Sequence, residues 1–562
     1  MSIFIIGTGS HSDVVESILR ECLAIGTIRK IDYKIFFENP ELEICKELGL
    51  MTKPFNAIVA IGDNFLRKKI VHQIERVMSQ VSWVNAVSKN AHIVEGVVFE
   101  VGNVICPGVI IQTKTKISNH VIINTGASVD HHNNILSYVH VAPAVCLCGN
   151  VTVHELAFIG SNSTVVPKMT VPPTKFIKAG VVVKESIPFI PIYIPNLKNY
   201  KDSAIDAINS EWISNHGKYI GLATDLLKEK LASKFCILMN NGTTATHCLF
   251  LALKFKHPNI KKVYVPNNTY IAAANMALME YTLPQLEVLK INSATWNMET
   301  SESYVLGLDV NSAVLIVHNL GGIVNVPRLK KLRPDLIFIE DCCEGLFGKY
   351  EGTYVGSSES SLAASVSFYG NKIITTGEGG AFLTSDKGVH EHISKVYSQG
   401  MSSRKYIHDL HAFNYRMTNI EAAFLYDQLQ DLPNILHSKQ VIFDNYTTLL
   451  QPLIKRGVVS LQELEVGTSR SNWIFALRLN GRPIEYDIRA EYFKTRGVDI
   501  RPFFYPLDDN AHLSQIKYHD PANKSVATSL NQEIIMIPSS PSLTLKEQEF
   551  IVDVIATHLE NK

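Results

Sequence analysis

The sequence predicts a multidomain chain that holds a small α/β module, a parallel β-helix and a larger α/β domain, in this order. Two strand–glycine–helix units lie near the N-terminus, apolar residues recur at every sixth position between residues 93 and 183, and strands alternate with helices beyond residue 195. Because the chain has 562 residues, it is also too long for a single hydrophobic core. Two or three domains are therefore expected.

The composition narrows the class of protein. The formal net charge is +0 and 46% of the residues are hydrophobic, which is typical of a soluble globular protein and indicates no nucleic-acid partner. The sequence contains no uninterrupted apolar run of roughly 18 residues that could span a membrane, and its first residues lack the basic start of a signal peptide. The nine cysteines show no paired zinc spacing, so we expect reduced thiols, a cytoplasmic protein and no metal site.

The first module is predicted over residues 1–90. A strand at residues 3–6 leads into GTGSH at positions 7–11, and a second strand at residues 57–61 ends in Gly62, Asp63 and Asn64 before a helix that carries Arg67. A glycine-rich turn at the start of a helix lets a phosphate approach backbone N–H groups. Two such units suggest a small Rossmann-like module, although ordinary strand–helix turns explain each unit equally well by itself.

Period six is the strongest signal in the chain. Stepping by six residues from Ile93 meets only apolar side chains: Phe99, Ile105, Ile111, Ile117, Ile123, Val129, Ile135, Val141, Leu147, Val153, Ile159, Val165, Val171, Ile177 and Val183. Chance would produce such a run about once in 10^5 trials. The period is typical of a parallel β-helix, in which each short strand places one apolar residue inside the prism. We assign residues 91–187 to this domain.

Two histidine-containing motifs on the repeat offer catalytic groups. His131 and His132 follow Val129-Asp130, and His140 follows Tyr138-Val139. Since nine residues separate His131 from His140, half of an 18-residue coil, we expect them on different faces of one chain. Such prisms usually form trimers, and a neighbouring subunit would complete a cleft. The alternative is that these histidines are simply solvated.

The motifs NTGASVDH at 124–131, YVHVAP at 138–143 and CGNV at 148–151 carry a family resemblance. With them, residues 1–187 resemble the sialic-acid-type and bacillosamine-type acetyltransferases, which join a small Rossmann-like domain to a left-handed β-helix. The resemblance implies that His131 is the catalytic base and that His140 contacts acetyl-CoA near its thioester. It further implies an acetyl-CoA site that includes Gly149, Ala179 and Gly180.

The same resemblance implies a nucleotide-sugar site in the first module. Its residues are Gly7, Gly9, Ser10, His11, Asp63, Asn64 and Arg67. The chain departs from the family at His132, where an acidic residue is common, and in the first loop, which reads Gly-Ser-His-Ser and not Ser-Gly-His-Gly. The chemistry is consistent, because an amine must lose a proton as it attacks the thioester, and an imidazole with an ordinary pKa of about 6.5 can accept it.

A proline-punctuated stretch at residues 186–195 ends the repeat and marks a domain boundary. Four elements then follow in order: NGTTAT at 241–246 opening an apolar helix, a strand ending in Glu340-Asp341, a turn-rich segment containing Lys372, and FNYRM at 413–417. Each element has an ordinary explanation, such as a helix cap or a solvated lysine. Together they supply what pyridoxal phosphate requires: a lysine for covalent attachment, a carboxylate for the ring nitrogen and a helix N-terminus for the phosphate.

With these elements, residues 195–562 resemble the nucleotide-sugar aminotransferases of the DegT type, of fold type I. The resemblance implies a large domain at 195–435 and a smaller C-terminal domain at 436–562. Lys372 would bind the cofactor and shuttle protons, Asp341 would pair with the ring nitrogen, Glu344 would lie beside the ring hydroxyl and Tyr270 would stack on the ring. Phosphate contacts would come from Gly242, Thr243, Thr244, Ser367 and, from a second subunit, Asn414. Substrate contacts would come from Trp212, Ser214, His318, Arg501 and Tyr505. Some relatives are dehydratases with histidine at the lysine position, so Lys372 favours transamination.

The two resemblances together predict a bifunctional enzyme of glycan biosynthesis. The aminotransferase would convert a UDP- or dTDP-linked 4-keto-6-deoxyhexose into its 4-amino sugar, with L-glutamate as donor, and acetyl-CoA would then acetylate this amine. Two alternatives remain: a β-helix that only trimerises the aminotransferase, or an O-acetyltransferase that acts on a different sugar. A trimeric β-helix and a dimeric aminotransferase together predict a homo-oligomer of six chains or more.

Overall fold

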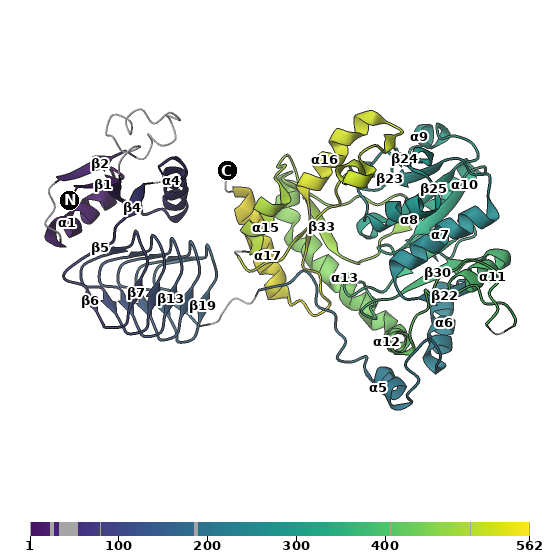
Figure 1. The fold of residues 1–562 in the computed structure, drawn as a ribbon, viewed down its shortest axis with the longest axis horizontal. Helices are drawn as coiled ribbons and strands as arrows, with labels where there is room; N and C mark the ends of the chain where they lie inside the picture. Colours follow the sequence, from purple (N-terminus) through teal and green to yellow (C-terminus); the bar gives the residue numbers. More distant parts are fainter. Residues whose placement is uncertain are drawn as a thin grey trace. The chain divides into compact units, whose positions relative to one another are not determined.

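The computed structural model describes residues 2–22, 27–32, 54–78, 80–184, 189–404, 406–494 and 496–560. The chain forms two compact units, one consisting mainly of Met1–Phe189 and the other beginning at Ile190 (Figure 1). Positions 186–188 of the expected linker lie outside the described residues. Within the described part of the chain, no helix has the length and apolarity that crossing a bilayer requires.

The first module is a parallel sheet with strand order β2-β1-β3-β4. Its strands are β1 (Ser2–Ile6), β2 (Thr27–Ile31), β3 (Phe55–Val59) and β4 (Val81–Trp83), and its helices are α1 (Ser10–Cys22) and α4 (Asn64–Val77). Gly7 ends β1 with a φ of +137°, and a Cβ at this position would lie 2.9 Å from the carbonyl oxygen of Ala60. Only glycine allows the first loop to pass this close to the end of β3.

Residues 86–183 form the predicted parallel β-helix, visible in Figure 1 as stacked coils below the module. Sheet 1 contains β5 (Ala86–Val87), β8 (Val104–Ile105), β11 (Ile122–Ile123), β14 (His140–Val141), β17 (Phe158–Ile159) and β20 (Phe176–Ile177). Sheet 2 contains β6 (His92–Ile93), β9 (Ile110–Ile111), β12 (Ser128–Val129), β15 (Cys146–Leu147), β18 (Thr164–Val165) and β21 (Val182–Val183). Sheet 3 contains β7 (Val98–Phe99), β10 (Lys116–Ile117), β13 (Asn134–Ile135), β16 (Thr152–Val153) and β19 (Thr170–Val171).

The sequence period of six matches the geometry of the coil. Each strand pairs in parallel with the strand one coil away, as Lys116 does with Asn134, and in the central coils the second residue of a strand, such as Ile111 or Val129, is fully buried. Residues that follow the strands take left-handed backbone conformations at repeated six-residue intervals, for example His120 and His132. The predicted fold class of this half is therefore confirmed.

The second unit is built on a mixed sheet with strand order β22-β30-β29-β26-β25-β23-β24-β35. Its strands are β22 (Phe235–Met239), β23 (Val263–Pro266), β24 (Leu286–Leu289), β25 (Ala313–Val317), β26 (Ile337–Asp341), β29 (Ala364–Ser367), β30 (Gly380–Thr384) and β35 (Lys517–Tyr518). Strand β30 runs antiparallel to both of its neighbours. The helices of this region are α5 (Asp202–Asn209), α6 (Lys218–Leu231), α7 (Gly242–Lys256), α8 (Ala272–Glu280), α9 (Glu302–Leu306), α10 (Val326–Leu332), α11 (Lys387–Val396) and α12 (Asn419–Gln430).

A smaller subdomain follows, with an antiparallel sheet of strand order β31-β33-β36-β34. Its strands are β31 (Val459–Ser460), β33 (Phe475–Leu479), β34 (Arg501–Pro502) and β36 (Ile534–Ile537). Its helices are α13 (Leu432–Leu449), α14 (Gln451–Lys455), α15 (Tyr486–Lys494), α16 (Lys524–Glu533) and α17 (Leu545–Glu560). A short sheet of β27 (Lys349–Tyr350), β28 (Thr353–Tyr354) and β32 (Thr468–Ser469) completes the unit.

Candidate active sites

The N-terminus of α7 forms an anion cradle in the second unit. Asn241 caps the helix by accepting the N–H of Thr244 at 2.9 Å. A Cβ on Gly242 would lie 2.6 Å from the Cβ of Ser367, so glycine is needed for the end of β29 to reach the helix start. The first N–H groups of a helix and adjacent hydroxyls suit a phosphate. The structure thus brings Gly242, Thr243, Thr244 and Ser367 to one place, as predicted for the phosphate site.

Asp341 ends β26 at the C-terminal edge of the parallel strands, where ligands bind in open α/β sheets. Its Oδ1 accepts the N–H of Cys343 at 3.0 Å, and its Oδ2 lies 3.5 Å from the hydroxyl of Thr246, which donates to it. The preceding residue, Glu340, points to the opposite face because side chains alternate along a strand. This alternation leaves one carboxylate, that of Asp341, on the side of the cradle.

His318 lies behind the sheet in the protein core. Its exposed fraction is 0%. The Nδ1 of His318 accepts the N–H of Val324 at 3.2 Å, so the proton is on Nε2, which donates to Glu340 at 3.2 Å. Tyr350 and Ser361 also donate to Glu340. The expectation that His318 contacts a substrate therefore differs from the structure, because both ring nitrogens are already bonded in the core.

A cluster of side chains with metal-ligand atoms lies at the same place in the core. His318, Glu340 and Cys342 carry ligand-type atoms within 4.8 Å of one another. The histidine nitrogens are used in hydrogen bonds, and burial raises the pKa of the Cys342 thiol, so the thiolate that a metal needs is disfavoured. We interpret the cluster as a hydrogen-bonded network that supports β26.

Lys372 lies in the loop that follows β29, on the cradle side. Its N–H donates to the carbonyl of Tyr369 at 2.9 Å, and its Nζ lies 3.7 Å from the centre of the Trp473 ring. Glu344 is close enough to feel the charge of Lys372 and accepts the N–H of Leu320 at 2.8 Å. Burial nevertheless dominates and raises the pKa of Glu344 to about 7.

The other predicted contacts of this site lie at the molecular surface. Tyr270 is 60% exposed, with its ring 6.3 Å from that of Phe504, and Trp212 and Tyr505 are also exposed. Asn414 is exposed and accepts from Arg416. Ser214 accepts the N–H of Asn419 through its carbonyl, and Arg501 pairs with Asp499 at 2.7 Å. Because they are exposed, the aromatic rings and Asn414 are accessible to a ligand or a second subunit.

His131 lies at the corner between sheets 2 and 3, over the next coil. A Cβ on Gly149 would lie 2.6 Å from the Cε1 of His131, so glycine makes room for the imidazole. The Nδ1 of His131 is 3.0 Å from the Nδ1 of His132, and its Nε2 is 4.0 Å from a carboxylate oxygen of Asp130. The ring is exposed. We call this corner, with residues 130–133 and 148–151, the His131 edge.

His140 lies in sheet 1, on a different face of the prism from His131, as predicted. Its Nδ1 is 3.0 Å from the carbonyl oxygen of Gly62, its Nε2 is 3.4 Å from the side-chain nitrogen of Asn124, and its ring centre is 6.5 Å from that of His11. Burial, with a smaller contribution from Arg67, lowers the pKa of His11 to about 4. Burial likewise lowers the pKa of His140 to about 4. Both rings are therefore neutral at pH 7.

The predicted acetyl-CoA residues divide between two edges of one chain. Gly149 belongs to the His131 edge, whereas Ala179 and Gly180 lie at the corner that follows β20 of sheet 1, the sheet of His140. We call this second region, with residues 124–127 and 178–181, the His140 edge. A single chain thus presents two incomplete halves of the predicted site.

Asp63, Asn64 and Arg67 hold the module on the β-helix. Asp63 caps α4, and the side chain of Asn64 donates to the carbonyls of Leu156 and Ala157 at 3.0 Å. Arg67 is buried and donates to carbonyls on both sides of the contact, at Ile61, Gly62, His120 and Tyr138, and to the side chain of Asn64. The substrate role expected for Asn64 and Arg67 differs from this arrangement, because their donors are already used.

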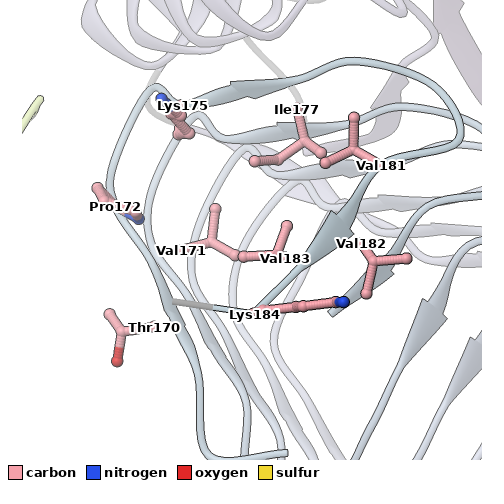
Figure 2. Close-up of a pocket in the computed structure, with 9 residues that line it drawn as sticks. All are labelled: Thr170, Val171, Pro172, Lys175, Ile177, Val181, Val182, Val183 and Lys184. Atoms are coloured by element: carbon pink, nitrogen blue, oxygen red, sulfur yellow. The ribbon is translucent and has the colours of Figure 1, made fainter. Parts of the chain in front are cut away.

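The last coils of the β-helix enclose a cavity of about 390 Å³ (Figure 2). Val171, Ile177 and Val183, the inward residues of three successive strands, line it. The cavity lies at the end of the described part of the prism, where the structure describes no further coil over the inward residues. It contains none of the predicted site residues.

Comparison with known proteins finds a family model for part of each unit. The model of the DegT/DnrJ/EryC1/StrS aminotransferase family matches residues 197–556. The chain belongs to this family. The PglD N-terminal domain model matches residues 2–74. Both predicted resemblances are thereby confirmed, and the second unit is an aminotransferase that uses pyridoxal phosphate.

Several relatives are sugar aminotransferases. The GDP-perosamine synthase of Escherichia coli O157:H7 is 30% identical over 378 residues, which cover 66% of this chain and 100% of the relative. A Helicobacter pylori UDP-4-amino-4,6-dideoxy-N-acetyl-beta-L-altrosamine transaminase is 26% identical over 272 residues, 46% of this chain and 71% of the relative. The solved structure of Helicobacter pylori PseC, an aminotransferase of pseudoaminic acid biosynthesis, matches with a TM-score of 0.58 at 22% identity, covering 66% of this chain and 100% of that one. This last match supports the fold.

Proposed function

We propose that the chain performs two consecutive reactions on a nucleotide-linked sugar. The second unit aminates a 4-keto-6-deoxyhexose, and the β-helix transfers an acetyl group from acetyl-CoA to the new 4-amino group. The observation that carries the first step is the gathering of Lys372, Asp341 and Glu344 beside the Gly242–Ser367 cradle. The match of the PglD N-terminal domain model supports the second step.

Each residue of the aminotransferase site has a distinct task. Pyridoxal phosphate, when bound, supplies a ring that accepts electrons from the substrate carbon. The Nζ of Lys372 attaches the cofactor and moves a proton, while the Asp341 carboxylate keeps the ring nitrogen protonated. Gly242, Thr243, Thr244 and Ser367 bind the phosphate, and Asn414 joins them from a second subunit. Tyr270 stacks on the ring, and Trp212, Ser214, Arg501 and Tyr505 border the sugar.

The acetyl transfer needs a base and an arrangement of two edges. The exposed Nε2 of His131 takes the proton that the amine loses as it attacks the thioester carbonyl. Because His131 and Gly149 lie on one edge and His140, Ala179 and Gly180 on another, a trimer of β-helices completes the site by placing unlike edges together. The loop with Gly7, Gly9, Ser10 and His11 holds the nucleotide sugar, with Asp63 at the start of α4.

The relatives and the PglD-like module support a nucleotide-linked sugar as the substrate. We propose UDP- or dTDP-linked sugars, and the GDP-perosamine synthases among the relatives add GDP-linked sugars as candidates. L-glutamate is the proposed amino donor. Mass spectrometry of products made from UDP-, dTDP- and GDP-linked 4-keto-6-deoxyhexoses, with glutamate and acetyl-CoA, selects among them. A product that gains an amine but no acetyl group with every substrate would indicate a non-catalytic β-helix.

Two matched variants test the division of labour. Lys372→Ala is expected to abolish amination while a supplied 4-amino sugar is still acetylated, because the two sites are separate. His131→Ala is expected to lower acetyl transfer at least about 100-fold with normal amination, the usual size of a general-base contribution. Both rates are measured on the purified full chain. Normal acetylation by His131→Ala would show that the base assignment is wrong.

The proposed sites also predict the assembly. The β-helix site requires three chains, and the contribution of Asn414 requires two aminotransferase units related by a two-fold axis, so six chains can satisfy both. Light scattering coupled to size-exclusion chromatography is expected to give a hexamer or a larger particle. A monomer in this measurement would contradict both shared sites.

A further inference from the structure

A fully buried lysine contacts the aromatic residues that hold the loop of the half-buried Lys372. Lys439 of α13 has an exposed fraction of 0%, and its Nζ donates to the carbonyls of Trp473 at 2.7 Å and Ser539 at 2.5 Å. No carboxylate pairs with it among the residues that the structure describes. Removing an ammonium from water without a counter-ion is unfavourable, and burial accordingly lowers the pKa of Lys439 to about 7. An apolar side chain of similar length would avoid this cost. The presence of a lysine at this buried position therefore indicates a specific role for its ammonium group.

Trp473 connects Lys439 to the catalytic loop. Its carbonyl receives the Lys439 ammonium, while its indole N–H donates to the carbonyl of Asn371 at 2.9 Å. The ring face receives the Nζ of Lys372 at 3.7 Å from its centre, within the range of a cation–π interaction. One buried side chain thus contacts both the backbone before Lys372 and its amino group.

Tyr193 makes a second connection to the same loop. Its hydroxyl donates to the carbonyl of Lys372 at 3.0 Å, and its ring centre lies 5.2 Å from the Nζ of Lys439. The carbonyls of Asn371 and Lys372 are therefore each held by an aromatic side chain. Lys439 contacts both of these aromatic residues, one through a hydrogen bond and one through its ring face.

We propose that Lys439 is a positioning residue for Lys372, acting through Trp473 and Tyr193, and that the Trp473 ring holds the amino group of Lys372 whenever it is not bonded to the cofactor. Over one full catalytic cycle the amino group of Lys372 would have to release the cofactor, move protons and bind the cofactor again. Its long side chain would otherwise sample many rotamers. A fixed resting place keeps Nζ near the reacting atoms, and misplacement of a reacting group by about 1 Å can cost about 100-fold in rate.

The test compares Lys439→Met with Lys455→Met in the full-length holoenzyme. Methionine replaces most of the alkyl chain of Lys439 but lacks the ammonium group and donates no hydrogen bond, and Lys455 is an exposed lysine of the neighbouring α14. For Lys439→Met we expect amination with kcat lowered roughly tenfold, KM changed less than about twofold, and a shifted pH midpoint of the bound cofactor's absorbance. Lys455→Met should match the wild type in all three. An unchanged kcat and midpoint in Lys439→Met would overturn the proposal.

A second variant separates positioning from general destabilisation. Trp473→Phe removes the N–H bond to Asn371 and weakens the cation–π contact while it keeps an aromatic ring. If Lys439 acts through Trp473, the double variant should be little worse than Trp473→Phe alone. Multiplicative losses, or a shift in the absorbance midpoint with Lys439→Met but not with Trp473→Phe, would contradict the route through Trp473. If Lys439→Met does not fold, Trp473→Phe alone tests the proposal. It must then shift the absorbance midpoint, and an unchanged midpoint would contradict the proposed role of the Trp473 ring.

Discussion

At the scale of single residues, burial decides what a charged side chain can do in this protein. Glu344 and Glu340 are both buried, but their environments differ. The Glu340 carboxylate accepts hydrogen bonds from one histidine and two hydroxyl groups. Glu344 accepts the N–H of Leu320 and lies near Lys372. Burial raises the pKa of Glu344 to about 7. A carboxyl group at this position can therefore change its charge in the physiological range.

Glu344→Gln tests the importance of this charge. Since burial favours the neutral carboxyl group, we expect the protonated form of Glu344 to be the active one. Wild-type amination should then fall as the pH rises above about 7, and Glu344→Gln should remove this fall because its amide does not ionise. The measurement is kcat for amination from pH 6 to 9. The same alkaline fall in both proteins would exclude Glu344 as its source.

At the scale of elements, the corners of the β-helix position the residues of the proposed acetyl-transfer site. The His131 ring rests across the next coil because Gly149 has no side chain there. The imidazole of His131 is exposed and can rotate away from a larger side chain at position 149. The fold of the coil should therefore tolerate such a side chain better than the position of the His131 ring does. Catalysis and stability should therefore respond differently to a methyl group at position 149.

Gly149→Ala makes this difference measurable. The new Cβ would lie 2.6 Å from the Cε1 and 2.8 Å from the Nε2 of His131, so the ring must move. We expect acetyl transfer to fall at least about tenfold, while the free energy of unfolding changes by less than about 1 kcal/mol. Thr152→Ala on sheet 3 serves as the control. Normal acetyl transfer by Gly149→Ala would mean that the observed ring position is not the working one.

At the scale of the whole molecule, the first unit carries a group of buried histidines. Burial, with Arg67 as a smaller cause, lowers the pKa of His120 to about 3, and His11 and His140 are lowered to about 4. These rings are neutral in the folded unit but bind protons below about pH 6.5 once unfolded. Between about pH 4 and 6.5 the unfolded state therefore holds more protons, and stability is lost as the pH falls.

The first unit should consequently be acid-sensitive. Each fully shifted histidine can remove up to about 1.4 kcal/mol of stability per pH unit below 6.5. The protection factor of the β11 amides in the first unit, which corrects observed hydrogen exchange for its intrinsic pH dependence, is expected to fall between pH 7 and 5. His120→Gln should reduce this effect, because glutamine does not titrate. Equal protection of β11 at both pH values would refute the histidine contribution.

Local sequence patterns predicted most of the fold and most of the residues of the candidate cofactor site. The six-residue period predicted the β-helix because each coil repeats the same inward position, a property of neighbouring residues only. The elements around Gly242, Asp341 and Lys372 were predictable because each combines a strand end or helix start with a characteristic side chain. Likewise, the separation of His131 and His140 onto different faces follows from counting residues along one coil.

Tertiary structure alone decided the environment of several charged residues. Arg67 bonds to carbonyls 53 and 71 residues away, His318 turns into the core toward Glu340, and Lys439 reaches Trp473 and Ser539. The hydrogen-bond acceptors of Arg67 and Lys439 are mainly backbone carbonyls. Because every residue has a carbonyl, no pattern of side chains in the sequence predicts these contacts. By itself the sequence determined the repeat, the order of cofactor motifs and the two-enzyme interpretation, whereas folding determined which polar groups face a ligand and which hold the protein together.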